Sequence, residues 1–164
     1  MTENEHVRRT SCRVIVLEGE SVLLIGSDGT DTGQLVWVVP GGGREAGESD
    51  RAAAIRELWE ETGMRVDPNT VDGPVASTHG SWTNHRGTTF DDETVFFAVW
   101  VSDRPPIDFS GLTRLENEVV REARWWTPSE LDGTMDTVYP RDLSGLVRHL
   151  LLNGIPTDPI EISW

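Results

Sequence analysis

The sequence predicts an α/β fold, with a mixed β-sheet packed between helices, and three observations support this class. Apolar and β-branched runs of strand length come first, and a well-delimited helical segment interrupts them at residues 51–62. Further strand-like runs then precede two helical segments that begin near residues 128 and 141. Strands and helices that alternate along a chain are typical of a sheet with helices on its faces. The length of 164 residues fits one domain.

The chain opens with a predicted hairpin. Two apolar runs, at residues 13–17 and 22–25, flank a polar turn at 18–21, which is the pattern of two strands joined by a short connection. Residues 26–34 are rich in Gly, Asp and Thr and predict a loop. The β-branched and aromatic residues at 35–39 predict a third strand, which ends at a proline followed by three glycines.

The helix at residues 51–62 has a clear start and a clear stop. Ser49 precedes its first turn, where a side-chain oxygen accepts a hydrogen bond from an unpaired backbone N–H. Gly63 follows at the position of a C-terminal cap. Ala52, Ile55 and Leu58 recur at helical spacing, so we expect one side of this helix to face the core.

The second half of the chain predicts further strands and two helices. Thr127-Pro128-Ser129-Glu130 combines capping-box spacing with a proline at the first helical position, so a short helix starts there. Leucines and a valine at helical spacing predict another helix over residues 141–152. The remaining predictions are strands at 71–82, 88–90, 94–101 and 119–126 and a loop at 102–113.

The charge balance excludes several classes of function. The chain has 28 acidic and 14 basic residues, a formal net charge of −14, and every basic residue is an arginine. Without lysine there is no Schiff-base lysine, P-loop lysine or Ser-Lys dyad. An acidic surface repels phosphate backbones, so we expect no nucleic-acid partner. Polyanionic substrates must then be bound through arginine or a metal cation.

The sequence also predicts the compartment and the domain limits. No run of about 18 apolar residues is present, which argues against a membrane span. The polar start of the chain does not resemble a signal peptide, and Cys12 has no second cysteine to pair with. We therefore expect a cytoplasmic protein with a polar tail at 1–11, a domain at 12–153 and a tail at 154–164. This last segment docks either on its own domain or on a second subunit of a homodimer.

Three carboxylates share one face of the helix at 51–62. At 100° per residue, Glu57, Glu60 and Glu61 fall within an arc of about 100°. Like charges this close cost roughly 0.2–0.5 kcal/mol per pair in an isolated helix. A site for Mg²⁺ or Mn²⁺ is one reason for such a cluster, since these cations prefer carboxylate oxygens. The alternative is a solvated acidic face. Arg56, within the cluster, can pair with Glu60 or with Glu48.

The segment from Gly42 to Met64 resembles the Nudix box, G-x5-E-x7-R-E-U-x-E-E-x-G-U, in which U is a bulky aliphatic residue. Every fixed position matches, with Met64 as the closing apolar residue. The resemblance extends to a strand-and-loop lead-in at 37–43, a central strand at 93–98 and a final strand and helix start at 118–131, so that it covers roughly residues 12–152.

The resemblance implies a Nudix-type α/β/α sandwich and a hydrolase that uses Mg²⁺ or Mn²⁺. The expected substrate is a nucleoside diphosphate linked to another moiety, and water attacks a phosphorus of the pyrophosphate. Arg56 is expected in the catalytic site, where it orients the carboxylates by salt bridging. The candidate metal ligands are Glu57, Glu60 and Glu61, with the Gly41 carbonyl and Glu48 as further ligands, Glu48 alternatively fixing Arg56.

The resemblance does not identify the general base or the substrate. The base candidates are Glu57 and a glutamate before the last strand, either Glu116 or Glu118, of which we prefer Glu118. The proline and tyrosine that mark some substrate subfamilies beyond the box are absent. We expect Trp82 to stack on a base and Arg86 and Arg114 to bind phosphate, although each is also explained as an ordinary packing or surface residue.

A second hypothesis is a Nudix domain that binds a nucleotide ligand without turnover. Such domains usually lose glutamates of the box or carry a DNA-binding module. This chain keeps every residue of the box, which favours the enzyme.

Overall fold

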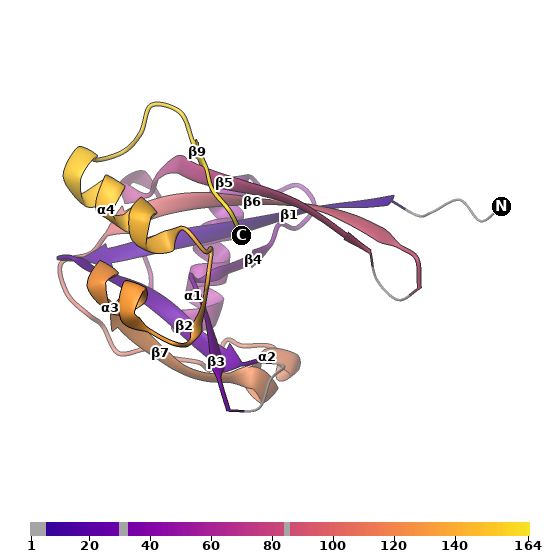
Figure 1. Cartoon of the computed structure of the whole chain (residues 1–164), viewed down its shortest axis with the longest axis horizontal. Helices are drawn as coiled ribbons and strands as arrows, with labels where there is room; N and C mark the ends of the chain where they lie inside the picture. The colour runs from indigo at the N-terminus through magenta and orange to yellow at the C-terminus, as the bar shows by residue number, and fades with distance from the viewer. Residues whose placement is uncertain (1–5, 30–32, 84–85) are drawn as a thin grey trace.

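The computed structural model describes residues 6–29, 33–83 and 86–164. In this part of the chain, one mixed sheet carries helices on both of its faces (Figure 1). The strands are β1 (His6–Glu18), β2 (Ser21–Asp28), β3 (Leu35–Val38), β4 (Gly41–Gly43), β5 (Asp72–Thr83), β6 (Thr89–Trp100), β7 (Val120–Trp126), β8 (Thr137–Tyr139) and β9 (Ile160–Glu161). The helices are α1 (Asp50–Thr62), α2 (Arg114–Val119), α3 (Pro128–Gly133), α4 (Leu143–Asn153) and the 3₁₀ turn η1 (Pro68–Thr70).

The strands lie in the order β8-β3-β2-β1-β6-β5-β9, while β4 pairs with β1 and β7 pairs with β2. β1 and β2 form the predicted hairpin, with Leu17 opposite Val22. The long central pair is parallel and runs from His6 opposite Thr89 to Leu17 opposite Trp100. This pair and β5 extend beyond the helices as an arm of three strands (Figure 1).

Two cores lie on opposite faces of this sheet, because successive side chains of a strand point to opposite faces. Ile15 and Leu17 of β1 are buried in the core that contains residues of α3 and α4. Val14 and Val16 of the same strand are buried in the core that contains Leu58 of α1. The predicted α/β/α sandwich around a mixed sheet is confirmed.

Both predicted tails contain a strand. β1 begins at His6, within the segment expected as a polar tail, because residues 6–11 pair with the outer part of β6. In the segment 154–164, β9 pairs in parallel with β5, and the Ile162 N–H donates to the Ser77 carbonyl oxygen. Of the two docking sites left open by the sequence, this segment lies on its own domain.

Several elements differ from the sequence-based expectation. β6 is continuous through the acidic residues 91–93, and β2 extends to Asp28. β4 consists of three glycines whose backbone pairs with β1, although glycine has no side chain that would predict a strand. The elements that the sequence did not predict are β4, α2, β8, β9 and η1. Within the described residues, no helix reaches the length and apolarity that crossing a bilayer requires.

Candidate functional site

Helix α1 is fixed at both ends and along one side. The Ser49 side chain accepts a hydrogen bond from the Ala52 N–H, as the sequence predicted for this N-cap. Gly63 ends the helix with a φ of 72° and donates its N–H to the Trp59 carbonyl oxygen at 2.8 Å. Leu58 is fully buried. These contacts orient the acidic face of α1 toward β4 and α2.

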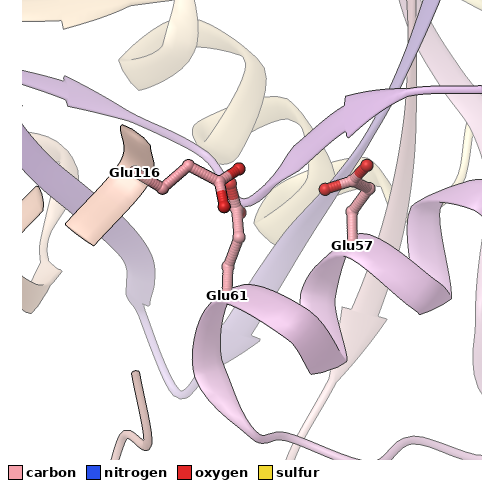
Figure 2. Close-up of side chains that lie close together, drawn as sticks. All are labelled: Glu57, Glu61 and Glu116. Carbon is pink, nitrogen blue, oxygen red and sulfur yellow. The ribbon is translucent and has the colours of Figure 1, made fainter. Parts of the chain in front are cut away.

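Three carboxylates from two helices meet beside this face. Glu57 and Glu61 of α1 and Glu116 of α2 each offer an oxygen, and these oxygens lie within 4.8 Å of one another (Figure 2). Glu116 is held by a capping box, in which its carboxylate accepts from the Thr113 N–H at 2.7 Å. The cluster therefore combines two ligand candidates of the Nudix box with one residue from a separate helix.

Burial makes the charge of this cluster costly. It raises the pKa of Glu61 to about 8, against the opposing effects of the Gly41 N–H and of the Arg13 guanidinium. The Gly41 N–H donates to the Glu61 carboxylate at 2.8 Å. The pKa of Glu57 is also raised, because the effect of burial outweighs the opposing effect of the Arg56 guanidinium. Clustered carboxylates whose charges repel fit a divalent cation such as Mg²⁺, which prefers hard oxygen ligands.

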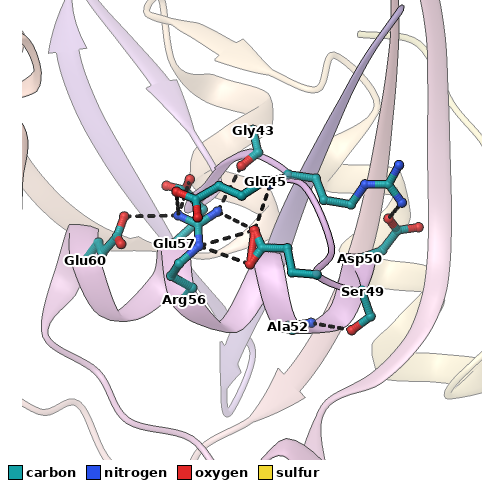
Figure 3. A network of polar contacts seen from close by, with 10 residues as sticks. Gly43, Glu45, Ser49, Asp50, Ala52, Arg56, Glu57 and Glu60 are labelled. Atoms are coloured by element: carbon teal, nitrogen blue, oxygen red, sulfur yellow. Dashed lines mark hydrogen bonds and ion pairs between the residues drawn. The ribbon is translucent and has the colours of Figure 1, made fainter.

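Arg56 links the helix to the loop before it (Figure 3). Its guanidinium donates to Glu48 at 2.7 Å, to Glu57 at 2.9 Å and to Glu60 at 3.2 Å, and also to the Gly43 carbonyl oxygen at 2.9 Å. The hydrogen bond from Arg56 lowers the pKa of Glu48. Glu48 thus fixes Arg56. Glu60 is not among the three carboxylates whose oxygens lie within 4.8 Å of one another.

The glycines of β4 allow the backbone to approach α1 closely. A Cβ on Gly42 would lie 2.6 Å from Cδ of Glu57, so a side chain there would displace that carboxylate. Gly41 has a φ of 152°, and its Cβ would lie 2.4 Å from the Cys12 carbonyl oxygen. The Gly41 carbonyl oxygen accepts a hydrogen bond from Arg13 at 3.3 Å. This close packing of β4 brings the Gly41 N–H to the Glu61 carboxylate, whereas the Gly41 carbonyl, an expected ligand, is bound by Arg13.

The structure brings Glu116, and not the preferred Glu118, to the two carboxylates of α1. Glu118 instead forms an ion pair with Arg114 at 3.7 Å, and the Arg114 side chain is 93% exposed. The reason is helix α2, in which residues 116 and 118 point about 200° apart. Arg114, expected to bind phosphate, lies on this exposed side of α2.

The other substrate-binding candidates lie on the arm. The backbone of Trp82 pairs with Phe90 in β5 and β6, but its side chain lies outside the described residues. Arg86 lies in the connection between these two strands. Arg13 pairs with Gly41 of β4 on one side and with Phe96 of β6 on the other, so Phe96 marks the level of the site along β6. Thr89, at the end of β6 next to Arg86, lies seven residues or about 23 Å from Phe96. The structure thus does not bring Arg86 to the carboxylates.

Sequence reasoning missed Arg13 and a groove beside it. The groove has a volume of about 410 Å³ and lies on the face of the sheet opposite α1. Arg13 also donates to the Val39 carbonyl oxygen at 2.9 Å. No pattern in the sequence distinguishes Arg13, since it begins an ordinary apolar strand. The lining of the groove includes Arg9, Arg13, Thr78, Asp92, Thr94 and Trp164.

Comparisons with known proteins show the family of the chain. The sequence profile of the NUDIX domain matches residues 7–146. An RNA pyrophosphohydrolase from Roseobacter denitrificans is 42% identical over 70 residues, which cover 41% of this chain and 43% of that protein. A MutT-like protein from Streptomyces ambofaciens is 29% identical over 103 residues, 63% of this chain and 55% of that protein. The chain thus spans about half of the length of these curated relatives.

A solved structure gives the same result for the fold. The solution structure of the E. coli ORF135 protein matches with a TM-score of 0.63 and 22% identity, over 93% of this chain and 96% of that chain. At this level of identity the similarity concerns the fold.

Proposed function

Because the chain belongs to the NUDIX domain family, we propose that it is a metal-dependent pyrophosphohydrolase. Its substrate is a nucleoside diphosphate linked to another moiety, such as a nucleoside triphosphate or a nucleotide sugar. The observation that carries this proposal is the group of three carboxylates within 4.8 Å. The intact Arg56 network beside it supports an enzyme over a domain that only binds nucleotides.

We assign the roles of the residues as follows. Glu57, Glu61 and Glu116 hold Mg²⁺ or Mn²⁺, with Glu60 and the Gly41 carbonyl as further ligand candidates. The cation, when bound, would neutralise charge on the phosphate oxygens and make the attacking water more acidic. Glu116 accepts the proton of that water, a task that a carboxylate beside the reacting atoms can perform.

The groove next to Arg13 suits the nucleoside end of such a substrate. Its volume of about 410 Å³ is within the usual range for small-molecule sites. It combines hydroxyl, carboxylate and guanidinium groups with the indole of Trp164. Because β1 and β9 belong to the sheet that builds this groove, we extend the proposed catalytic domain from 12–153 to residues 6–164.

An RNA 5′ end must be tested as well. The acidic net charge of −14 argues against a nucleic-acid partner. The RNA pyrophosphohydrolase relative nevertheless makes a triphosphate at the end of an RNA chain a candidate substrate.

The test is a panel of substrates incubated with Mg²⁺ and ranked by kcat/KM. It contains nucleoside triphosphates, oxidised triphosphates, nucleotide sugars, dinucleoside polyphosphates and a short RNA with a 5′-triphosphate. The control variants are Glu61→Gln, which we expect to lose Mg²⁺-dependent turnover, and Glu20→Gln at an exposed turn. Tight binding of one compound without turnover of any would refute the enzyme and support the binding domain.

A further inference from the structure

Trp164 is held in a defined place above the groove. The Ser163 N–H donates to the Asp142 carboxylate at 2.9 Å, and the Ser163 carbonyl oxygen accepts from the Arg141 N–H at 3.2 Å. The indole stacks on Tyr139 with ring centroids 5.6 Å apart and an interplanar angle of 8°. The side of the groove that Trp164 forms is therefore fixed by contacts with the segment 139–142.

The indole in turn lies against Arg13. The guanidinium carbon of Arg13 is 5.0 Å from the centroid of the Trp164 ring, a distance at which a cation and an aromatic face attract each other. On its other side, Arg13 donates to the carbonyl oxygens of Val39 and Gly41. The guanidinium is thus oriented between an aromatic ring and the backbone of the strand that approaches α1.

Arg13 keeps an unused donor. Its Nε is shielded from solvent and has no hydrogen-bond partner among the described residues. A buried donor without a partner is costly, and a charged ligand oxygen is the acceptor that satisfies it best. Arg13 also lines the groove and bonds to Gly41, whose N–H donates to Glu61. Arg13 therefore connects the groove to the backbone segment that hydrogen-bonds Glu61.

We propose that Arg13 binds a phosphate oxygen of the substrate at the inner end of the groove and that Trp164 is the positioning residue that holds its guanidinium there. The phosphate-bearing nature of the ligand rests on the proposed function. In a chain without lysine and with a cluster of acidic ligands, this arginine supplies the positive charge that the phosphates need on the groove side.

The test uses Arg13→Gln, Trp164→Leu, Trp164→Phe and the double variant of the first two, with Trp100→Leu as the matched control. Trp100 is 41% exposed, against 42% for Trp164, and lies at the opposite end of β6 from the groove. Leucine keeps apolar bulk against Tyr139 but lacks a π face, so that folding, checked by thermal unfolding, is preserved. Phenylalanine keeps the π face.

We expect Arg13→Gln to raise KM about tenfold or more and Trp164→Leu to raise it about three- to tenfold, the strength of a partly exposed cation–π pair. Trp164→Phe and Trp100→Leu stay close to the wild type, and kcat changes less than KM. The double variant should match Arg13→Gln alone, because Trp164 acts through Arg13. Additive effects, or equal effects of Trp164→Leu and Trp100→Leu, would overturn the proposal.

A second measurement does not depend on turnover. Calorimetric titration with inorganic pyrophosphate in the presence of Mg²⁺ should show the same order of affinity losses among these variants. Unchanged pyrophosphate affinity in Arg13→Gln would overturn the phosphate role of Arg13. If the wild type hydrolyses no compound of the panel, the proposed function fails, and this titration still decides the roles of Arg13 and Trp164.

Discussion

The backbone of Gly42 lies directly against the carboxylate of Glu57. A Cβ on Gly42 would stand 2.6 Å from Cδ of Glu57 and 2.7 Å from both of its carboxylate oxygens. Because Arg56 holds the same carboxylate from the side at 2.9 Å, Glu57 cannot move away without breaking that ion pair. The first glycine of the Nudix box is thus explained by the space that the Glu57 carboxylate occupies.

Gly42→Ala should therefore disable the site with little loss of fold. We expect kcat/KM to fall by at least about a hundredfold, because small misplacements of catalytic groups have effects of this size. The control is Gly145→Ala in α4, where a Cβ meets nothing within 4 Å. That control should keep activity and stabilise the helix by about 1 kcal/mol. Normal activity of Gly42→Ala would mean that Glu57 does not need its observed position.

Glu116 and Glu118 give the sharpest comparison of two nearby residues. Glu116→Gln should lower kcat by about 10²–10⁴-fold, the usual contribution of a general base. Glu118→Gln should stay close to the wild type, because Glu118 only pairs with the exposed Arg114. Steady-state kinetics at saturating Mg²⁺ measure both. The reverse order of effects would restore our original preference for Glu118.

The raised pKa of Glu61 predicts how stability depends on pH without metal. Its pKa is about 8 in the folded chain, against 4.5 for an unperturbed carboxyl. Between these values the folded state keeps a proton that the unfolded state has released, so the free energy of unfolding falls as pH rises. The slope from this one group is at most about 1.4 kcal/mol per pH unit.

Glu61→Gln removes this slope. In urea denaturation with EDTA, the variant should gain stability relative to the wild type as the pH rises from about 5 to about 8. Titrating groups outside the cluster of Glu57, Glu61 and Glu116 act alike on both proteins and cancel in the difference. A difference that stays constant over this range would show that Glu61 ionises normally.

Metal addition should have the opposite dependence on pH. Carboxylate ligands must release their protons to bind Mg²⁺, so we expect a larger rise in Tm at about pH 8 than at about pH 6. At a Mg²⁺ concentration of about 100 times Kd, the stabilisation is about 2.7 kcal/mol. Differential scanning calorimetry with and without EDTA measures it. Glu116→Gln should weaken the effect, and an equal response in that variant would remove Glu116 from the metal site.

Helix α1 and its network could be predicted from the sequence because their determinants are local. Ser49 and Gly63 cap the helix within its own neighbourhood, and Arg56 meets Glu48 and Glu60 through the fixed spacing of the box. The same spacing put Glu60 with the expected metal ligands, and in the structure Arg56 donates to the carboxylate of Glu60 as well as to that of Glu57. Helical periodicity predicts which glutamates share a face of α1, but it does not predict which of them pair with Arg56 and which are free to bind a cation.

The rest of the site depends on contacts between distant segments. We predicted a loop at 102–113 and a strand at 119–126 and no helix between them, so the sequence did not distinguish the positions of Glu116 and Glu118. The position of the Arg13 guanidinium depends on its contact with Trp164, and Trp164 lies there because β9 pairs with β5. Three consecutive glycines are typical of a loop, yet in β4 they form a strand that pairs with β1. Sequence patterns carry no information on such pairings.

From the parallel pairing of β1 with β6 we expect the site to form late in folding. Parallel pairs join segments far apart in the chain, and such contacts form slowly because the loop between them must close first. Arg13 reaches Gly41 only when β1 has found both β6 and β4. A chain that has formed α1 but not this pairing would already show helical circular dichroism and still bind pyrophosphate poorly. Ligand affinity therefore reports completion of the whole sheet, whereas helix content reports only its beginning.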